Sequence, residues 1–494
     1  MRTMVRQEFQ SSEELNRLMM TFNRRGFLTG AVSLAGVTTL AHSRLLAAAA
    51  AVGVPRLKFG VLSDIHLYEP GDEDTFIKAL EYFRDHGADG VLIAGDIAHT
   101  GGYGQLKRCA DAWKKVFPDD KAPDGRHVEK LFIYGNHDIE CQNCDKRPAN
   151  DPEFEVDSAI GNGLNRVRMW EKAFGEKYEP IWMKQVKGYT FIGAHWDKSD
   201  HTEIEAFMAV HGKEIDPKKP FFYTQHAHPK DTCMGAWAWG RDNGAATRAF
   251  AKFPNCVAFS GHSHYTLTDE RSVWQGAFTS INTASLRYAS ADYSLRENFG
   301  GNKYGYCGEK RPHRMKHIET YNGRQGMLVS VFDGCLVIER REFVYGQSLG
   351  DDWVVPMPAA DGAYSCEKRA ARRTAPEFAA GAKVAVKVTP KADEKDFTHV
   401  TLTFPAAEMR QKCRVFEYEA TAVLCEDEVE LVQAQRRMMS PDFHLPVSQL
   451  VKEVEVTFAA DDLPLKGHYR FEVRPVECFG KRGGKIESGI VEVV

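Results

Sequence analysis

The sequence predicts an α/β layer fold followed by a small β-sandwich, and three observations support this prediction. Short apolar runs alternate with stretches of helical periodicity from residue 57 to residue 262, which is typical of strands connected by helices. A stretch rich in Pro, Gly, Ala and charged residues then follows, as in a linker. Beyond it, several runs alternate apolar and polar residues between turn residues, as the strands of a β-sandwich do.

Local patterns justify each element of the first domain. A strand is expected where apolar residues stand together, as in residues 91–94, because a strand covered on both faces has no polar side. A helix is expected where apolar residues recur three and four positions apart, as in residues 73–87, which end at a glycine. The expected elements are strand 57–64, helix 73–87, strand 90–96, helix 104–117, strand 130–136, helix 162–175, strands 189–195 and 220–226, helix 244–253 and strand 256–262.

Residues after 268 complete this organisation. Apolar runs up to residue 347 fit strands that finish the sheet of the first domain. We therefore expect an α/β domain over residues 55–347, a linker over residues 348–380 and a β-sandwich domain over residues 381–494.

The composition of the 494-residue chain excludes some classes of function. Apolar residues make up 43% and charged residues 27%, as in an ordinary soluble globular protein. The formal charge of −4 gives no basic field, so no nucleic-acid-binding patch is expected. The body of the chain has no apolar run long enough for a membrane span.

The N-terminus has a different pattern. Arg24 and Arg25 precede Phe27, Leu28 and a weakly apolar run rich in Ala, Gly, Ser and Thr, which is typical of a twin-arginine export signal. We interpret residues 1–51 as a signal peptide that is removed, with an uncleaved membrane anchor as the alternative. The expected location is periplasmic or secreted, and the expected partner during export is the twin-arginine translocase.

Polar side chains follow five of the expected strands. In open α/β sheets, ligands bind outside the carboxyl ends of the strands, so these side chains are expected to meet at one edge. Within the D-x-H and H-x-H endings, alternate side chains of extended backbone point to the same side. The endings are Ser63-Asp64-Ile65-His66, Gly95-Asp96, Gly135-Asn136-His137-Asp138, Gln225-His226-Ala227-His228 and Gly261-His262-Ser263-His264.

The donor atoms of these endings favour metal ions. They are oxygens and nitrogens, and no cysteine is among them, which suits Mn, Zn, Fe, Co or Mg. The set is too large for one tetrahedral ion. Two divalent ions about 3.5–4 Å apart, bridged by a carboxylate, would use it fully, so we predict a dinuclear metal centre.

The order of motifs, D-x-H, G-D, G-N-H-D, a strand-end His and G-H-x-H, resembles the calcineurin-like metallophosphoesterase family over about residues 55–345. It is similar in particular to an exported bacterial subgroup in which a C-terminal β-domain follows. The resemblance implies an αββα sandwich of the metallophosphoesterase type. It also implies a metal-dependent hydrolase of phosphate esters, either monoesters or diesters.

The resemblance assigns a role to each motif. The D-x-H motif and the last histidine of the G-H-x-H motif would hold the first metal. The carboxylate of the G-D motif would bridge both metals. An amide and two imidazoles would complete the second metal. The implied ligands are Asp64, His66 and His264 for the first metal, Asp96 as the bridge, and Asn136, His226 and His262 for the second, with His228 as the alternative to His226.

The same resemblance implies that His137 is catalytic. It would face the substrate and donate a proton to the leaving oxygen, while a metal-bridging hydroxide attacks phosphorus in line. Three residues after the bridging Asp96, where some relatives carry a carboxylate that orients the catalytic histidine, this chain has His99. The group that orients His137 therefore stays open, and Asp138 is expected to orient nearby backbone.

Residues beside the motifs are candidates for a substrate pocket. Trp239 and Arg241 would contact a small-molecule or lipid phosphoester, because a guanidinium suits phosphate and an indole suits a base, sugar or lipid face. The alternative is a loop whose tryptophans pack on the core. His195 is a weaker candidate of the same kind. Cys141 and Cys144 form a C-x-x-C, which fits either a disulfide or two thiols.

Two other functions fit part of the pattern. A metal-dependent amidohydrolase is disfavoured because the first motif is D-x-H, from Asp64 to His66, rather than H-x-H. A non-catalytic metal-binding exported scaffold, whose β-domain binds a surface polymer, is disfavoured because His137 has no purpose in metal storage. The substrate, the preference for monoesters or diesters, the native metals and the oligomeric state stay open.

Overall fold

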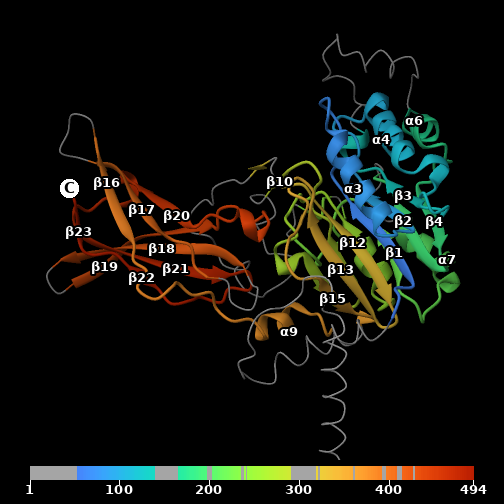
Figure 1. Ribbon diagram of the computed structural model, residues 1–494. Coiled ribbons are helices and arrows are strands. Elements are labelled where there is room, and N and C mark those ends of the chain that lie inside the picture. The colour runs from blue at the N-terminus through green and yellow to red at the C-terminus, as the bar shows by residue number, and fades with distance from the viewer. Residues whose placement is uncertain are drawn as a thin grey trace, which may run out of the picture. The chain divides into compact units, whose positions relative to one another are not determined.

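Two β-sheets packed against each other form the core of the first domain in the computed structural model (Figure 1). The predicted signal peptide 1–51 lies outside the described residues, as do Cys141, Cys144 and Arg241. The structure describes residues 53–139, 165–196, 203–234, 238–240, 242–290, 319–320, 323–359, 362–391, 397–408, 414–426 and 429–494.

The first sheet has seven strands in the order β14-β13-β12-β1-β2-β3, with β15 paired to β13. Strands β1, β2 and β3 are parallel, whereas β12 to β15 pair in antiparallel fashion. The strands are β1 (Leu57–Leu62), β2 (Gly90–Ala94), β3 (Glu129–Ile133), β12 (Gln325–Phe332), β13 (Cys335–Glu342), β14 (Gln347–Ser348) and β15 (Trp353–Pro356).

The second sheet has six strands in the order β4-β5-β6-β7-β9-β8. Its inner strands β5, β6, β7 and β9 are parallel, and β4 and β8 pair antiparallel at the two edges. Strands β10 (Ala289–Ser290) and β11 (Glu319–Thr320) form a separate ribbon. The six strands are β4 (Ile181–Val186), β5 (Tyr189–Ala194), β6 (Phe221–Thr224), β7 (Cys256–Ser260), β8 (Val273–Gln275) and β9 (Thr279–Asn282).

Helices cover the outer face of each sheet. The alternation of strand side chains shows the layers: in β2, Val91 and Ile93 pack with the helices, while Leu92 and Ala94 pack with the other sheet. The predicted αββα sandwich is therefore confirmed. The helices are α3 (Glu73–Asp85), α4 (Tyr103–Val116) and α6 (Asn165–Phe174) on the first sheet, and α7 (Glu203–His211) and α8 (Ala245–Phe250) on the second.

The predicted elements of the first domain are present, but several strands end about two residues earlier than expected. Strand β1 stops at Leu62 and β7 at Ser260, because the polar residues that follow leave the extended conformation and turn toward the site. Two elements were missed. Strand β4 pairs with β5 at the sheet edge, and α7 packs on the second sheet through Ile204 and Met208.

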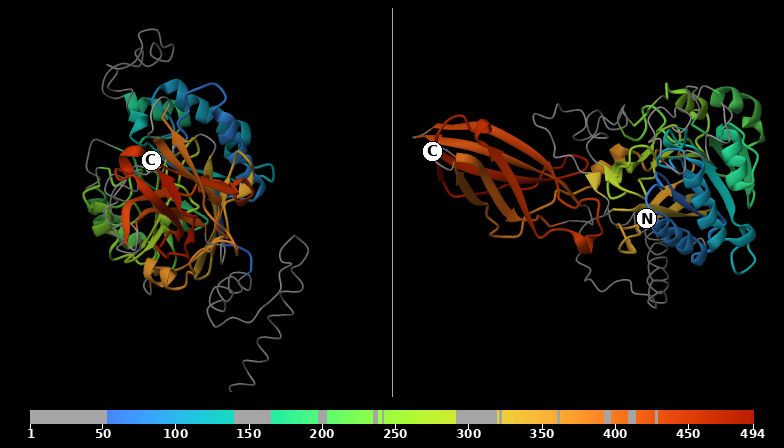
Figure 2. Two further views of the ribbon diagram at one scale, coloured as in Figure 1. Left: turned by 90° about the vertical axis from the view of Figure 1, so that its left-hand side faces the viewer. Right: turned by 90° about the horizontal axis from the view of Figure 1, so that it is seen from above.

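The C-terminal domain is a β-sandwich, as predicted. A three-stranded sheet, β16-β17-β20, faces a five-stranded sheet, β19-β18-β21-β22 with β23 paired to β21, and Figure 2 shows both from two further sides. In β20 the buried residues Val454, Val456 and Phe458 alternate with exposed ones. The strands are β16 (Ala385–Pro390), β17 (Phe397–Pro405), β18 (Val415–Glu426), β19 (Val429–Met439), β20 (Glu453–Ala459), β21 (Gly467–Glu477), β22 (Ile486–Glu487) and β23 (Val491–Val493).

The range 348–380 was predicted as a linker, and the structure differs. Strand β15 lies within it and pairs with β13 of the first sheet, with Trp353 opposite Ile338. Helix α9 (Cys366–Ala371) follows, capped by the Ser365 side chain. The prediction weighed the Pro, Gly and charged residues of this range and overlooked its apolar Trp353–Pro356 run, which is a strand-forming pattern.

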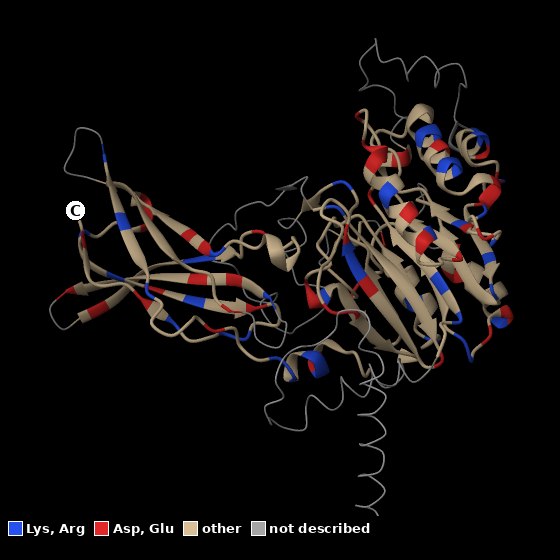
Figure 3. Ribbon diagram, in the orientation of Figure 1, with Lys and Arg blue, Asp and Glu red and all other residues tan. Residues whose placement is uncertain are grey.

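Two features of the described residues correspond to the composition of the chain: the distribution of charged residues and the character of the helices. Lys and Arg residues are interspersed with Asp and Glu along the strands and helices drawn in Figure 3. Among the described residues, no helix has the length and apolar character that a membrane span requires.

Phe59 in β1 packs at the centre of the contact between the two sheets. Its ring centroid lies 5.1 Å from that of Phe191, 4.8 Å from Phe222 and 5.8 Å from Phe259. Because Phe→Ala in a packed core removes apolar contacts and leaves a cavity, Phe59→Ala is expected to lower the free energy of unfolding by about 3–5 kcal/mol. Urea denaturation of the metal-free protein measures it.

The matched control for this prediction is Tyr345→Ala. Tyr345 lies in the turn after β13 and its side chain is exposed, so the expected change is within about 0.5 kcal/mol. Equal effects of the two substitutions would contradict the position of Phe59 between the sheets.

Candidate metal centre

The carboxyl ends of the parallel strands bring the predicted ligands together. Strands β1, β2 and β3 are in register, with Leu62 opposite Ile93 and Ala94 opposite Ile133. The chain segments that leave them therefore start at the same edge. Strands β6 and β7 of the second sheet end at the same place, since His226 from the loop after β6 reaches the carbonyl of Ala94.

Five of the predicted ligands have left-handed main chains. The φ angles are 51° at Asp64, 47° at His66, 51° at Asp96, 66° at His262 and 50° at His264. This region is uncommon for residues other than glycine, and the strain, on the order of 1–3 kcal/mol each, gathers at functional sites. Main-chain hydrogen bonds hold the turns: the Asp64 and His66 amides donate to the carbonyls of Gly95 and Asp96, both at 3.0 Å.

Two glycines of the motifs permit this close approach. A Cβ at Gly135 would lie 2.1 Å from Asp96 Oδ1, and a Cβ at Gly261 would lie 2.4 Å from Asp64 Oδ2. Any side chain at these positions would push the carboxylates away, so the glycines in G-N-H-D and G-H-x-H belong to the geometry of the site.

The carboxylates and imidazoles meet in a buried cluster. His226 Nε2 lies 3.0 Å from Asp96 Oδ2, and His264 Nε2 lies 2.9 Å from Asp64 Oδ1. His66 Nε2 lies between the two carboxylates, 3.8 Å from Asp64 Oδ1 and 3.7 Å from Asp96 Oδ2. Donor atoms of Asp64, His66, Asp96 and His264 all lie within 4.8 Å of one another, which is the arrangement that a shared cation requires.

The electrostatics of the cluster suit metal ligands. Burial holds the pKa of His66 and His262 well below the ordinary value, so both imidazoles are neutral, the form that binds metals. Burial opposes the ionisation of Asp96, but the facing imidazole of His226 outweighs it and holds the pKa of Asp96 well below its usual range. Burial also opposes the charge on His226, yet Asp96 and Asp64 raise its pKa to about 9, so a metal ion bound by this imidazole would have to displace its proton.

The Asn136 amide gives an independent test of whether a metal fits. Its side-chain oxygen is buried and has no hydrogen-bond partner, although an unsatisfied buried acceptor costs about 1–3 kcal/mol. The same holds for Nδ1 of His264. A bound cation would supply the partner for the Asn136 oxygen, so the residues present fit a metal ion.

Neighbouring groups fix the orientation of the ligands. His226 Nδ1 donates to the Ala94 carbonyl at 2.7 Å, which directs Nε2 at the carboxylates. Ser63 Oγ donates to Asp64 Oδ2 at 2.5 Å, and the His262 amide donates to the same oxygen at 3.1 Å. The His137 amide donates to Asp96 Oδ1 at 2.9 Å. These partners pre-form the site before any metal binds.

Trp196 belongs to the site, and sequence reasoning missed it. Its ring lies 5.8 Å from that of His226 and 5.7 Å from that of His262, whose own rings are 5.2 Å apart. The signal was its place two residues after the end of β5 at Ala194, the position that Asp96 and His226 hold after β2 and β6. Its apolar surface covers the two histidines from one side.

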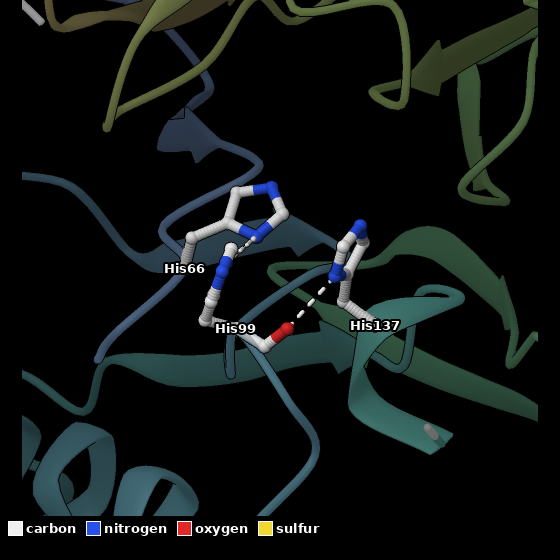
Figure 4. Close-up of side chains that lie close together, drawn as sticks. All are labelled: His66, His99 and His137. Atoms are coloured by element: carbon white, nitrogen blue, oxygen red, sulfur yellow. Dashed lines mark hydrogen bonds between the residues drawn. The ribbon is translucent and has the colours of Figure 1, made fainter. Parts of the chain in front are cut away.

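His137 stands beside the cluster with His66 and His99 (Figure 4). Its Nδ1 donates to the main-chain oxygen of His99 at 2.8 Å, and its ring stacks on that of His99 at 5.5 Å. His99 Nδ1 lies 3.3 Å from His66 Nδ1. A main-chain carbonyl, that of His99, therefore holds Nδ1 of His137, whose orienting group the sequence left open.

Asp138 fastens two of the site turns together. Its Oδ1 accepts the Ala98 amide and its Oδ2 accepts the Gly135 amide, both at 2.7 Å. Burial, followed by the nearby charge of Asp96, raises the pKa of Asp138 to about 7. The expectation that Asp138 orients nearby backbone agrees with these contacts.

Two further histidines lie outside the cluster of donor atoms. His228 is buried, with Nε2 3.2 Å from Ser263 Oγ, and burial lowers its pKa to about 3. His195 Nδ1 accepts the Tyr134 amide at 2.9 Å, and its ring packs 4.5 Å from that of Trp170. His226 lies 3.0 Å from a carboxylate of the cluster, whereas the contact of His228 is with Ser263, so the geometry favours His226 over His228 as the ligand.

The candidate substrate contacts are only partly described. Arg241 lies outside the described residues. Trp239 is partly buried, and its indole Nε1 is buried with no hydrogen-bond partner. Tyr68 is 44% exposed with its ring 5.2 Å from that of His99, so it lies at the rim of the site.

The fold is of the α/β class and carries a candidate metal centre, and a family comparison agrees with both. Residues 57–266 match the family described as calcineurin-like phosphoesterase. The matched range contains all five motifs on which the predicted resemblance rests. The comparison with curated proteins finds no match.

Three solved structures illustrate the likeness of the fold. A dimetal phosphatase from Danio rerio is 11% identical over 61% of this chain and 99% of its own, with a TM-score of 0.34. GAP50, the anchor in the inner membrane complex of Plasmodium, is 11% identical over 61% and 88%, with a TM-score of 0.36. Vps29 from Entamoeba histolytica, complexed with zinc, is 10% identical over 61% and 99%, with a TM-score of 0.26. Scores below 0.5 support no functional argument.

The contrast between His226 and His228 is testable. His226→Ala removes an imidazole that lies 3.0 Å from Asp96. Loss of an outer-shell partner of a metal ligand typically weakens metal binding about 10–100-fold. Loss of His226, a ligand itself, is expected to raise the dissociation constant for Mn²⁺ by more than that. His228→Ala, the matched control, is expected to keep the wild-type metal content. Calorimetric titration of metal-free protein measures both, and a larger loss in the His228 variant would reverse the assignment.

Proposed function

We propose that this protein is an exported hydrolase of phosphate esters that depends on a dinuclear metal centre. The observation that carries the proposal is the buried convergence of two carboxylates with imidazoles from three separate turns, Asp64 and Asp96 with His66, His226 and His264. The family match over residues 57–266 supports a phosphoesterase. We propose three further points with it: the reaction is hydrolysis, two metal ions take part, and the substrates are phosphate esters.

Each predicted ligand has a place in the proposed centre. The carboxylate of Asp64 and the imidazoles of His66 and His264 would hold one ion. Asn136, His226 and His262 would hold the other, and Asp96 would bridge both. Two bound divalent cations supply a nucleophile from water near neutral pH and offset the charge of the phosphoryl oxygens.

His137 is the proposed general acid. Since its Nδ1 proton is committed to the carbonyl of His99 at 2.8 Å, the proton for the leaving oxygen would come from Nε2. The amide that His137 donates to Asp96 Oδ1 fixes its distance from the bridging carboxylate. The same residue thus links the metal cage to the leaving-group side of the substrate.

The substrate and setting complete the proposal. The substrate is a small-molecule or lipid phosphoester, with Trp239 and Arg241 as the proposed contacts. Export by the twin-arginine translocase to the periplasm or beyond follows from the Arg24-Arg25 pattern. This route carries folded proteins, which would allow the metals to enter before transport.

Activity with and without metal tests the function. The protein, metal-free and then reconstituted with Mn²⁺, is assayed on p-nitrophenyl phosphate and bis-p-nitrophenyl phosphate. We expect turnover that a chelator abolishes and Mn²⁺ restores. Asp96→Asn keeps the shape of the bridge but removes its charge, so it is expected to lose both ions and nearly all turnover. Binding of Mn²⁺ without hydrolysis of either ester would favour the non-catalytic scaffold.

The proposed role of His137 predicts a separation of binding from chemistry. His137→Ala is expected to bind Mn²⁺ like the wild type, because no metal is assigned to it, and to lose about 10²–10⁴-fold in kcat. Metal analysis and steady-state kinetics on the same preparation measure the two quantities. Loss of metal in this variant would instead identify His137 as a ligand.

A further inference from the structure

The loops that carry three of the ligands run on into a buried cluster beyond the site. After His226, the chain contributes Cys233, Met234 and Ala238 to this cluster, and Tyr265 enters it directly after His264. Tyr265 and Met234 are fully buried. The apolar residues that anchor both ligand loops therefore belong to a cluster separate from the core between the two sheets.

The other members of this cluster belong to the C-terminal domain, except Cys366 of α9. Phe416 of β18 is fully buried there, and both domains are parts of one compact unit, Pro55–Val494. The β-sandwich has its own separate core, which contains Phe458 and Phe471. The further members from the C-terminal side are Cys366, Met439, Phe443, Val476, Cys478 and Phe479.

A buried polar chain connects Phe416 to the metal centre. The guanidinium of Arg271 lies 4.5 Å from the centre of the Phe416 ring, a cation–π contact that gains strength when water is excluded. Arg271 Nη2 and the Tyr265 hydroxyl both donate to Asp269 Oδ2 at 2.7 Å. Tyr265 is covalently next to His264, whose imidazole faces Asp64.

A second connection holds the same loop. Gln325 Oε1 accepts the Leu267 amide at 2.8 Å, and its Nε2 donates to the carbonyl of His444 at 2.6 Å. All three residues are buried. The loop after β7 is thus fastened to the C-terminal domain on both sides of Thr266.

We propose that the C-terminal β-sandwich positions the metal centre, and that Phe416 is a positioning residue that acts on His264 through Arg271 and Tyr265. The proposal deepens the proposed function, because it assigns the C-terminal domain to the same site. A metal tolerates little displacement of its ligands, and His264 sits in a left-handed turn that its surroundings must maintain. The packing of the C-terminal domain supplies part of that support.

Two phenylalanines of one domain test the proposal. Phe416→Ala removes the ring that faces Arg271, and Phe471→Ala removes a ring of the same size from the core of the β-sandwich. The dissociation constant for Mn²⁺, measured by calorimetry on metal-free protein, is expected to rise about tenfold for Phe416→Ala. It is expected to stay within about twofold of wild type for Phe471→Ala, because Phe471 packs in the separate core of the β-sandwich and not in the cluster that holds the described residues of the ligand loops.

A conservative variant separates positioning from unfolding. Phe416→Leu keeps most of the apolar volume but loses the ring face that Arg271 contacts, so it is expected to fold like the wild type and to recover only part of the Mn²⁺ affinity lost in the alanine variant. Wild-type affinity in Phe416→Ala, or an equal loss in Phe416→Ala and Phe471→Ala, would overturn the proposal. This test measures Mn²⁺ binding and not hydrolysis. If the protein hydrolyses no phosphoester, the proposed function is wrong, but the result of this test is unchanged.

Discussion

The site depends on two carboxylates held close together out of water. Asp64 and Asp96 follow neighbouring parallel strands, and both are buried while facing the same imidazoles. Two negative charges in such a place repel each other and lose their hydration, which the protein tolerates only with compensating positive charge. The glycines, the left-handed turns and the surrounding histidines all follow from this requirement. Bound metal ions, as proposed above, would meet it more completely than protonation of the histidines does.

The sequence was sufficient to predict most of this arrangement because strand ends are a strong signal. Apolar runs that stop at Asp, Asn or His indicate which strands end at the site and which residues lie at that edge, and Asp64, Asp96 and His264 lie close together there, as that reasoning predicts. The left-handed conformations shorten β1 and β7, which explains why the predicted strands were too long. The apolar Trp353–Pro356 run was overlooked because its flanking residues are typical of linkers.

Other features depend on contacts that no local pattern reveals. The carbonyl of His99 orients His137. Because every residue has a main-chain carbonyl, the residue type at position 99 does not indicate this contact. Trp196 covers two ligands, but an aromatic residue after a strand is usually part of the core. The contact between Arg271 and Phe416 joins positions far apart in the chain, so only the folded structure could pair them.

The left-handed turns also shape how such a centre can change in evolution. Asparagine tolerates this backbone region nearly as well as aspartate does, whereas β-branched residues do not. A single Asp-to-Asn exchange at position 64 or 96 would therefore abolish the charge that cations need and leave the loops undisturbed. A lineage that no longer needs the chemistry can thus keep the scaffold intact for another purpose, such as recognition of a former substrate.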